Sequence, residues 1–169
     1  PVTITITTAQ ITVTADNKTK EYGAPDPALT YTHTGLVAGD TTAVFSGVLV
    51  RLNASENVGV YPITQGSLSA GNNYAIGFIG ANLTINKKPI TVTAVTNTKT
   101  YDGNTSAAGT PAITGSLVGT DVAGFTETYD TKNVGTNKTL TPSGIVNDGN
   151  SGANYSYTFA VDGTGGITA

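Results

Sequence analysis

The sequence predicts an all-β protein made of two similar domains in tandem. Three observations support this prediction: a set of motifs that occurs twice in one order, segments of alternating apolar and polar residues, and frequent turn residues. Of the 169 residues, 21 are Gly and 7 are Pro, which is typical of short strands separated by turns. We expect two small Ig-like β-sandwiches, with mostly-β modules of the β-grasp type as the alternative.

Five motifs of the first half recur in the second half. The offset is nearly constant, from 133 − 57 = 76 to 154 − 73 = 81 residues. Motifs repeated in order at one period indicate related units in an array. The pairs are Ile11–Ala15 with Ile90–Ala94, Thr19–Gly23 with Thr98–Gly103, Gly35–Asp40 with Gly115–Asp121, Asn57–Gly59 with Asn133–Gly135, and Gly71–Tyr74 with Gly152–Tyr155.

Period-two alternation of apolar and polar residues predicts the strands, while no segment has the spacing of an amphipathic helix. Clear examples are 2–7, 11–15, 90–94 and 155–159. Pro89 has no N–H to donate to a ladder, so the domain join is expected near 86–89. We therefore divide the chain into an N-terminal strand that belongs to or completes a neighbouring domain (1–9), a first domain (10–86) and a second domain (87–169).

The N-terminal strand motivates a hypothesis about assembly. Residues 2–8 precede Ile11 much as 81–89 precede Ile90, so they are similar to the closing strand of a domain. We expect the second half to have a weak closing strand or none, because Val161 is followed by several glycines. A missing strand would leave unpaired backbone groups. We expect Val2, Ile4 and Ile6 of one copy to complete domain two of the next, head to tail, either covalently or as strand exchange between subunits. The alternative is that residues 2–8 pair at the edge of their own domain.

Composition excludes several classes of function. Charged residues are 11% of the chain, against a usual share of about 25%, and the net charge is −3. No basic face exists for nucleic acid, and no apolar run is long enough for membrane insertion. There is no Cys and a single His, His33. We therefore expect no enzyme activity, no catalytic residues, no metal site and no cofactor.

The turn motifs Tyr22-Gly23 and Tyr101-Asp102-Gly103 follow the first strand of each half. Gly supplies positive φ, and Asp can bond its own backbone, so we interpret these residues as turns rather than a sugar-stacking platform. Asp and Asn around 147–150 are interpreted in the same way rather than as a calcium loop, whose carboxylate spacing is absent.

An isopeptide crosslink would need a buried lysine beside Asn and a carboxylate, with Lys18, Lys20 and Lys99 as the candidates.

The ordered motifs resemble two known families. The first half is similar to the MBG domain of the YGX type, through 11–15, Lys20–Gly23, Asp26-Pro27, Gly39-Asp40, Asn57–Tyr61 and Asn73-Tyr74. The second half resembles the YDG domain, through Lys99–Asn104, Lys132–Gly135 and Asn154-Tyr155. The resemblance implies tandem modules of exported bacterial adhesins and surface proteins, with a structural or adhesive role and no established catalytic residues.

The combined expectation is a non-catalytic stalk module of an extracellular fibre or adhesin at the bacterial cell surface. Its expected partners are other copies of itself or neighbouring repeats. The alternative is a module that binds glycan or mucin. An exposed aromatic cluster in one half without a counterpart in the other would favour that alternative. The candidates are Phe45, Tyr61 and Phe78 in the first half and Phe125, Tyr129 and Tyr157 in the second.

Overall fold

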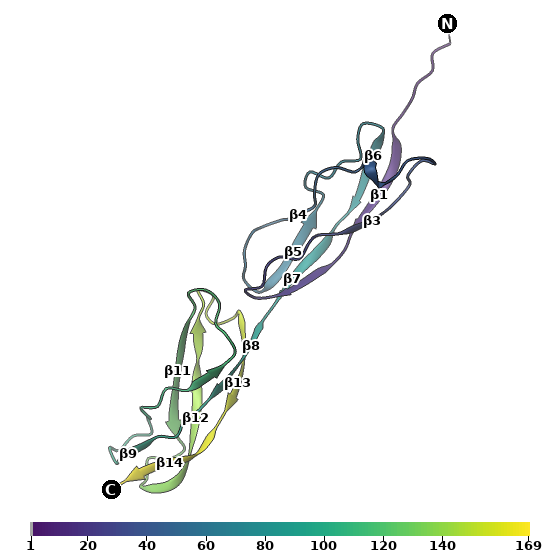
Figure 1. The fold of residues 1–169 in the computed structure, drawn as a ribbon. Helices are drawn as coiled ribbons and strands as arrows, with labels where there is room; N and C mark the ends of the chain where they lie inside the picture. The colour runs from purple at the N-terminus through teal and green to yellow at the C-terminus, as the bar shows by residue number, and fades with distance from the viewer. Residues whose placement is uncertain (1) are drawn as a thin grey trace. The chain divides into compact units, whose positions relative to one another are not determined.

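The computed structural model describes residues 2–169 and contains two β-sandwich domains (Figure 1). The chain divides between Asn86 and Lys87, and we call the two parts domain one and domain two. The described residues contain no α-helix, only one 3₁₀ turn at Thr42–Val44. The all-β prediction is confirmed, and two packed sheets in each domain favour the sandwich over the β-grasp alternative.

Domain one pairs a three-stranded sheet of order β3-β1-β6 with a four-stranded sheet of order β2-β7-β5-β4. Most of its strands alternate buried and exposed residues, as the period-two pattern predicts. The strands are β1 (Ala9–Ala15), β2 (Lys18–Glu21), β3 (Tyr31–Thr34), β4 (Val50–Arg51), β5 (Gly59–Thr64), β6 (Tyr74–Ile79) and β7 (Ala81–Asn86).

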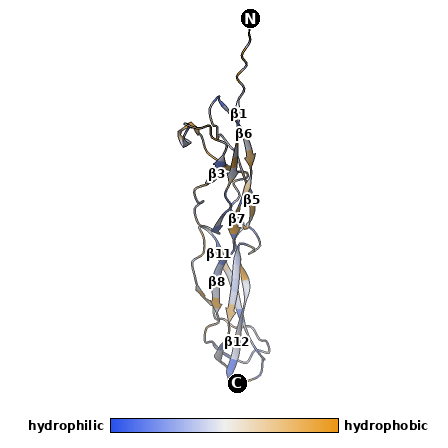
Figure 2. Ribbon diagram, turned by 90° about the vertical axis from the view of Figure 1, so that its right-hand side faces the viewer, coloured by the Kyte–Doolittle hydropathy of each residue, from blue (hydrophilic) through white to orange (hydrophobic). Residues whose placement is uncertain are grey.

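Domain two repeats this plan with sheets of order β10-β8-β13 and β11-β12-β14-β9. Its longest strand, β12, is rich in Thr and Asn and is drawn mostly in pale and blue tones in Figure 2. The strands are β8 (Lys88–Thr93), β9 (Thr98–Thr100), β10 (Ala112–Thr114), β11 (Val122–Tyr129), β12 (Gly135–Asn147), β13 (Tyr155–Ala160) and β14 (Asp162–Thr168).

Each core consists of the inward residues of its two sheets. In domain one, Val13, Ile63 and Leu83 are almost fully buried in one cluster. In domain two, Tyr129, Leu140 and Ile167 form the corresponding cluster. Burying one such side chain stabilises the fold by about 1.5–3 kcal/mol, so the alternation that predicts the strands also sets which face enters the core.

The first and last parts of domain one lie side by side and run parallel. β1 passes from one sheet to the other after Asp16 and Asn17 and continues as β2, and β6 does the same at Gly80 and continues as β7. β1 pairs with β6 over six positions, and β2 pairs with β7 over four. The Asn17 side chain accepts a hydrogen bond from the Asn82 N–H at 2.9 Å, so the two crossing points are tied together.

Domain two has the same parallel arrangement. β8 pairs with β13 over six positions, and β9 pairs with β14 over three. β14 also pairs antiparallel with β12, with two register shifts. β14 is therefore the closing strand of domain two, and the expectation that this strand is missing is wrong. The alternating pattern did not reveal β14, because its glycines contribute no apolar side chains to an alternation.

Candidate functional site

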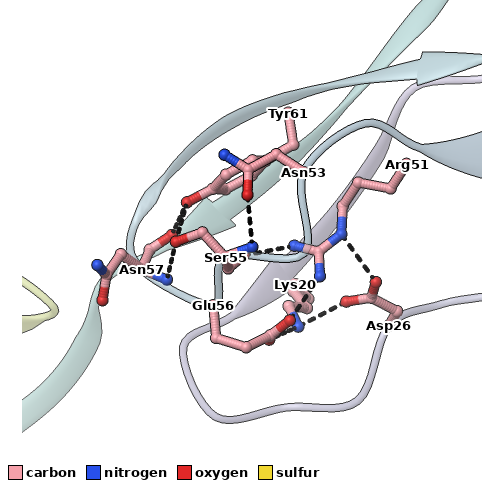
Figure 3. Close-up of polar contacts among 8 residues, drawn as sticks. All are labelled: Lys20, Asp26, Arg51, Asn53, Ser55, Glu56, Asn57 and Tyr61. Atoms are coloured by element: carbon pink, nitrogen blue, oxygen red, sulfur yellow. Dashed lines mark hydrogen bonds and ion pairs between the residues drawn. The ribbon is translucent and has the colours of Figure 1, made fainter.

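The polar contacts of domain one concentrate on a ring of four charges, drawn in Figure 3. Lys20 on β2 contacts Asp26 at 2.6 Å and also contacts Glu56. Arg51 on β4 contacts the same two carboxylates, at 3.1 Å from Asp26 and 2.5 Å from Glu56. Two cations and two anions alternate, so the ring is neutral and ties β2, β4 and the loops after them together.

Burial is unequal within this charge ring. The Lys20 and Arg51 side chains are 3% and 9% exposed, whereas Asp26 and Glu56 are 40% and 52% exposed. Burial alone would lower the pKa of Lys20, but the hydrogen bonds to Asp26 and Glu56 outweigh it and raise that pKa. The bonds from Lys20, aided by Arg51, lower the pKa of Glu56. Lysine and carboxylate are thus kept charged, which favours an ion pair over the neutral amine that an isopeptide crosslink requires.

Arg51 connects the charge ring to Tyr61 on β5. Its guanidinium lies 5.2 Å from the centre of the Tyr61 ring and donates to the Ser55 carbonyl at 2.7 Å. The Tyr61 hydroxyl donates to the Asn57 carbonyl, four residues upstream, at 2.6 Å. This contact fixes the loop onto the strand that follows.

A second contact, the tyrosine clasp, occurs in both domains. The Tyr74 hydroxyl donates to Asp40 at 2.6 Å and accepts from the Val37 N–H at 2.9 Å. In domain two, Tyr155 donates to Asp121 at 2.6 Å and accepts from the Val118 N–H at 2.8 Å. The two motifs of this clasp were visible in the sequence, but their mutual contact was not predicted. Their identical separation, 74 − 40 = 155 − 121 = 34 residues, was the available signal.

The turn motifs differ more between the domains than their sequences suggest. Gly23 and Gly103 both have φ of 81°, a conformation that favours glycine. Tyr22 is buried, whereas Tyr101 is 49% exposed. Asp102 accepts from the Lys99 ammonium at 2.7 Å and from the Asn104 N–H at 3.1 Å. Lys99, the counterpart of Lys20, bonds chiefly within its own turn, and its ammonium also lies 5.5 Å from the centre of the Tyr129 ring on β11.

The loop before β13 is organised around one carboxylate. Asp148 accepts three backbone N–H groups: Asn150 and Gly152 at 2.8 Å and Asn154 at 3.0 Å. Burial alone would raise the pKa of Asp148, and these three bonds outweigh it and lower that pKa. Both carboxylate oxygens already accept bonds from the protein, an arrangement that makes a rigid loop.

Several chemical functions find no support in the arrangement of side chains. Within residues 2–169, no group of three His, Asp or Glu side chains could hold a metal ion. Glu127 is buried on β11, where it accepts the Val95 N–H at 2.9 Å and so holds the segment after β8. No helix in this part of the chain is long and apolar enough to cross a membrane.

The aromatic candidates divide between core and surface. Tyr61, Phe125 and Tyr129 are buried. On β13, Tyr157 stacks on Phe159 with ring centres 5.9 Å apart, and Phe159 is 43% exposed. In domain one, Phe45 and Phe78 are half-buried against the core. An open cleft of about 310 Å³ lies between residues 6–9 and the loops of the tyrosine clasp.

Comparison with known proteins agrees with this repeated architecture. The family model of the MBG domain (YGX type) matches residues 11–84, and that of the YDG domain matches residues 86–162. No curated protein and no solved structure matches the chain. Both families are non-catalytic repeat domains, typical of extracellular, adhesin-like proteins. The chain therefore contains an MBG domain of the YGX type at residues 11–84, followed by a YDG domain at residues 86–162.

Proposed function

We propose that this chain is a non-catalytic, force-resisting stalk segment of an extracellular fibre or adhesin at the bacterial cell surface. One observation carries the proposal: in both domains the strand by which the chain enters pairs in parallel with the strand by which it leaves. Tension between the two ends of a domain then pulls parallel partners in opposite directions. The ladder bonds, which cross between the strands, are loaded in shear and must break together.

The side-chain contacts support the same function. The charge ring and the tyrosine clasps fix loops beside the parallel strand pairs. Because the sequence has no Cys, resistance to force would not depend on disulfide bonds within the chain. The motifs that define the two families here serve to position the backbone, which suits a structural module more than a binding module.

The test compares two directions of pulling on domain one. Because the chain has no Cys, cysteines introduced at Thr8 and Lys87 give unique handles that shear the parallel ladder. Handles at Thr8 and Asn73 lie at the same end of β1 and β6, since Ala9 pairs with Tyr74, and so unzip it. Single-molecule force spectroscopy should give a clearly higher unfolding force for the first pair. Equal forces would refute the proposal.

A second candidate function is glycan or mucin binding at domain two, motivated by the exposed Phe159 stacked on Tyr157. Aromatic faces suit the apolar faces of sugars. Titration with mucin-type oligosaccharides, followed by NMR shifts of domain two, tests it. Shifts that vanish in Phe159→Ala, and persist in the domain-one control Phe78→Ala, would support this function. Absence of shifts at millimolar sugar would exclude it.

A further inference from the structure

Residues 2–8 lie outside both sheets of domain one. No strand pair of the described structure includes them, and Val2, Ile4 and Ile6 are 93%, 83% and 92% exposed. β6 begins at Tyr74, which pairs with Ala9, so the chain before Ala9 extends past the end of the sheet (Figure 1). An alternating strand-forming segment with three exposed aliphatic residues has no counterpart in its own domain.

The counterpart of this segment within the chain is β7. Ile11 corresponds to Ile90, an offset of 79, so residues 2–7 correspond to 81–86 and Thr8 to Lys87. Ile4 and Ile6 then correspond to Leu83 and Ile85, which are 0% and 1% exposed in the core of domain one. The outward positions of the segment are all Thr. Residues 2–7 therefore have the inward and outward pattern of a closing strand.

In both domains of this chain the position of the closing strand is already occupied. β7 lies between β2 and β5, and β14 lies between β9 and β12. Register places Gly165 of β14 where Leu83 lies in β7, because Ile85 pairs with Lys20 and Ile167 with Lys99. A Cβ at Gly165 would come within 3.0 Å of the Tyr129 ring. An isoleucine would not fit there. The closing position of domain two is therefore unsuited to residues 2–7 of another copy, which we had expected to bind there.

We propose that residues 2–7 are the closing strand of a further β domain of this type, which is joined to domain one through Thr8. The inference rests on the proposed stalk function and names the partner of its N-terminal strand. Ile4 and Ile6 enter the partner's core. The strand pairs parallel with the equivalent of β2 and antiparallel with the equivalent of β5. One residue separates it from β1, as Lys87 alone separates β7 from β8, so tension passes from one domain's closing strand directly into the next domain's opening strand.

The experiment extends the full chain with a domain that lacks its closing strand. A second copy of residues 9–80 is placed directly before Val2, so that 2–7 follow Gly80 as 81–86 do. Because the chain contains no Trp, Phe45→Trp in the added copy reports on that copy alone. We expect a cooperative urea transition of this tryptophan, with folded emission in buffer. Unfolded emission at all urea concentrations would overturn the proposal.

Three variants of the extended chain control this result. Ile4→Asp with Ile6→Asp should abolish the transition of the added copy. Thr3→Asp with Thr5→Asp places the same charges on the outward face and should keep the transition. Replacing residues 2–7 by the sequence of β7 gives the folded reference. If the two aspartate pairs behave alike, the register is refuted. No force is applied, so the outcome is independent of the pulling test of the stalk function.

Discussion

Domains one and two share a backbone plan but hold it with different side chains. In domain one, Arg51 on β4 lies over Tyr61 on β5. Register makes Tyr129 the counterpart of Arg51 and Lys138 that of Tyr61, because Arg51 pairs with Ile63 and Tyr129 with Leu140. Aromatic and basic residues have exchanged strands at these two positions, and the cation over the Tyr129 ring is Lys99 of β9, 5.5 Å from its centre. The parallel ladder and the tyrosine clasp are retained, which indicates that they define the module, while the remaining polar contacts are replaceable.

The largest effect should come from the equivalent core positions. Ile63→Ala and Leu140→Ala each remove a side chain that is at most 2% exposed, at a cost of about 2–5 kcal/mol because a cavity remains. Each substitution should lower the urea midpoint of its own domain alone, measured by NMR signals from each domain. If either substitution also shifts the other domain's midpoint, the two domains do not unfold independently.

The next effect tests the carboxylate of domain two. Asp148→Ala removes an acceptor of three backbone N–H groups and should destabilise domain two by about 2 kcal/mol, since bonds to a charged acceptor are strong. The change should be almost the same at low and high salt. Asp130→Ala, at an exposed carboxylate 3.6 Å from Lys138, is the control and should cost under about 0.5 kcal/mol. A similar loss in both variants would contradict the assigned role of Asp148.

The tyrosine clasp should contribute to both domains in the same direction. Tyr155→Phe leaves Asp121 and the Val118 N–H without the hydroxyl and should cost domain two about 1 kcal/mol. Tyr74→Phe should lower the midpoint of domain one in the same way. Thermal melting with hydrogen exchange of the loops 35–40 and 115–121 checks both. An effect in one domain alone would show that the clasp is not a shared device.

The smallest expected effect is a pH dependence of stability that comes from the charge ring and is therefore confined to domain one. The folded pKa of Glu56 lies below its unfolded value of 4.5, so its contribution is complete above pH 4.5 and is lost as pH falls through the folded pKa. The folded pKa of Lys20 is above 10.5, so its contribution is lost as pH rises through that value. Because the carboxylates are about half exposed, we expect less than about 1 kcal/mol, weakened by salt. Glu56→Gln should reduce the loss of stability of domain one at acid pH, measured by urea unfolding across that pH range. An unchanged loss would contradict this assignment.

Some expectations from sequence were only partly correct, for physical reasons. The strands with apolar alternation were located well, because Ile11 and Val13, like Ile90 and Val92, show their inward face in the sequence. β14 was missed, because Gly165 occupies an inward position without a side chain. The charge ring around the buried Lys20 was not predicted, because Arg51 and Glu56 come from a segment more than 30 residues away.

The sequence by itself determined the all-β class, the two tandem units, the family and the inward faces of the regular strands. These follow from period and repetition, which are properties of neighbouring residues. The tertiary structure decided the parallel pairing of entering and leaving strands, the charge ring, the tyrosine clasps and the filling of both closing-strand positions by β7 and β14. Most of those features depend on contacts between residues 34 or more positions apart. Such contacts depend on how two sheets pack, which local pattern does not encode.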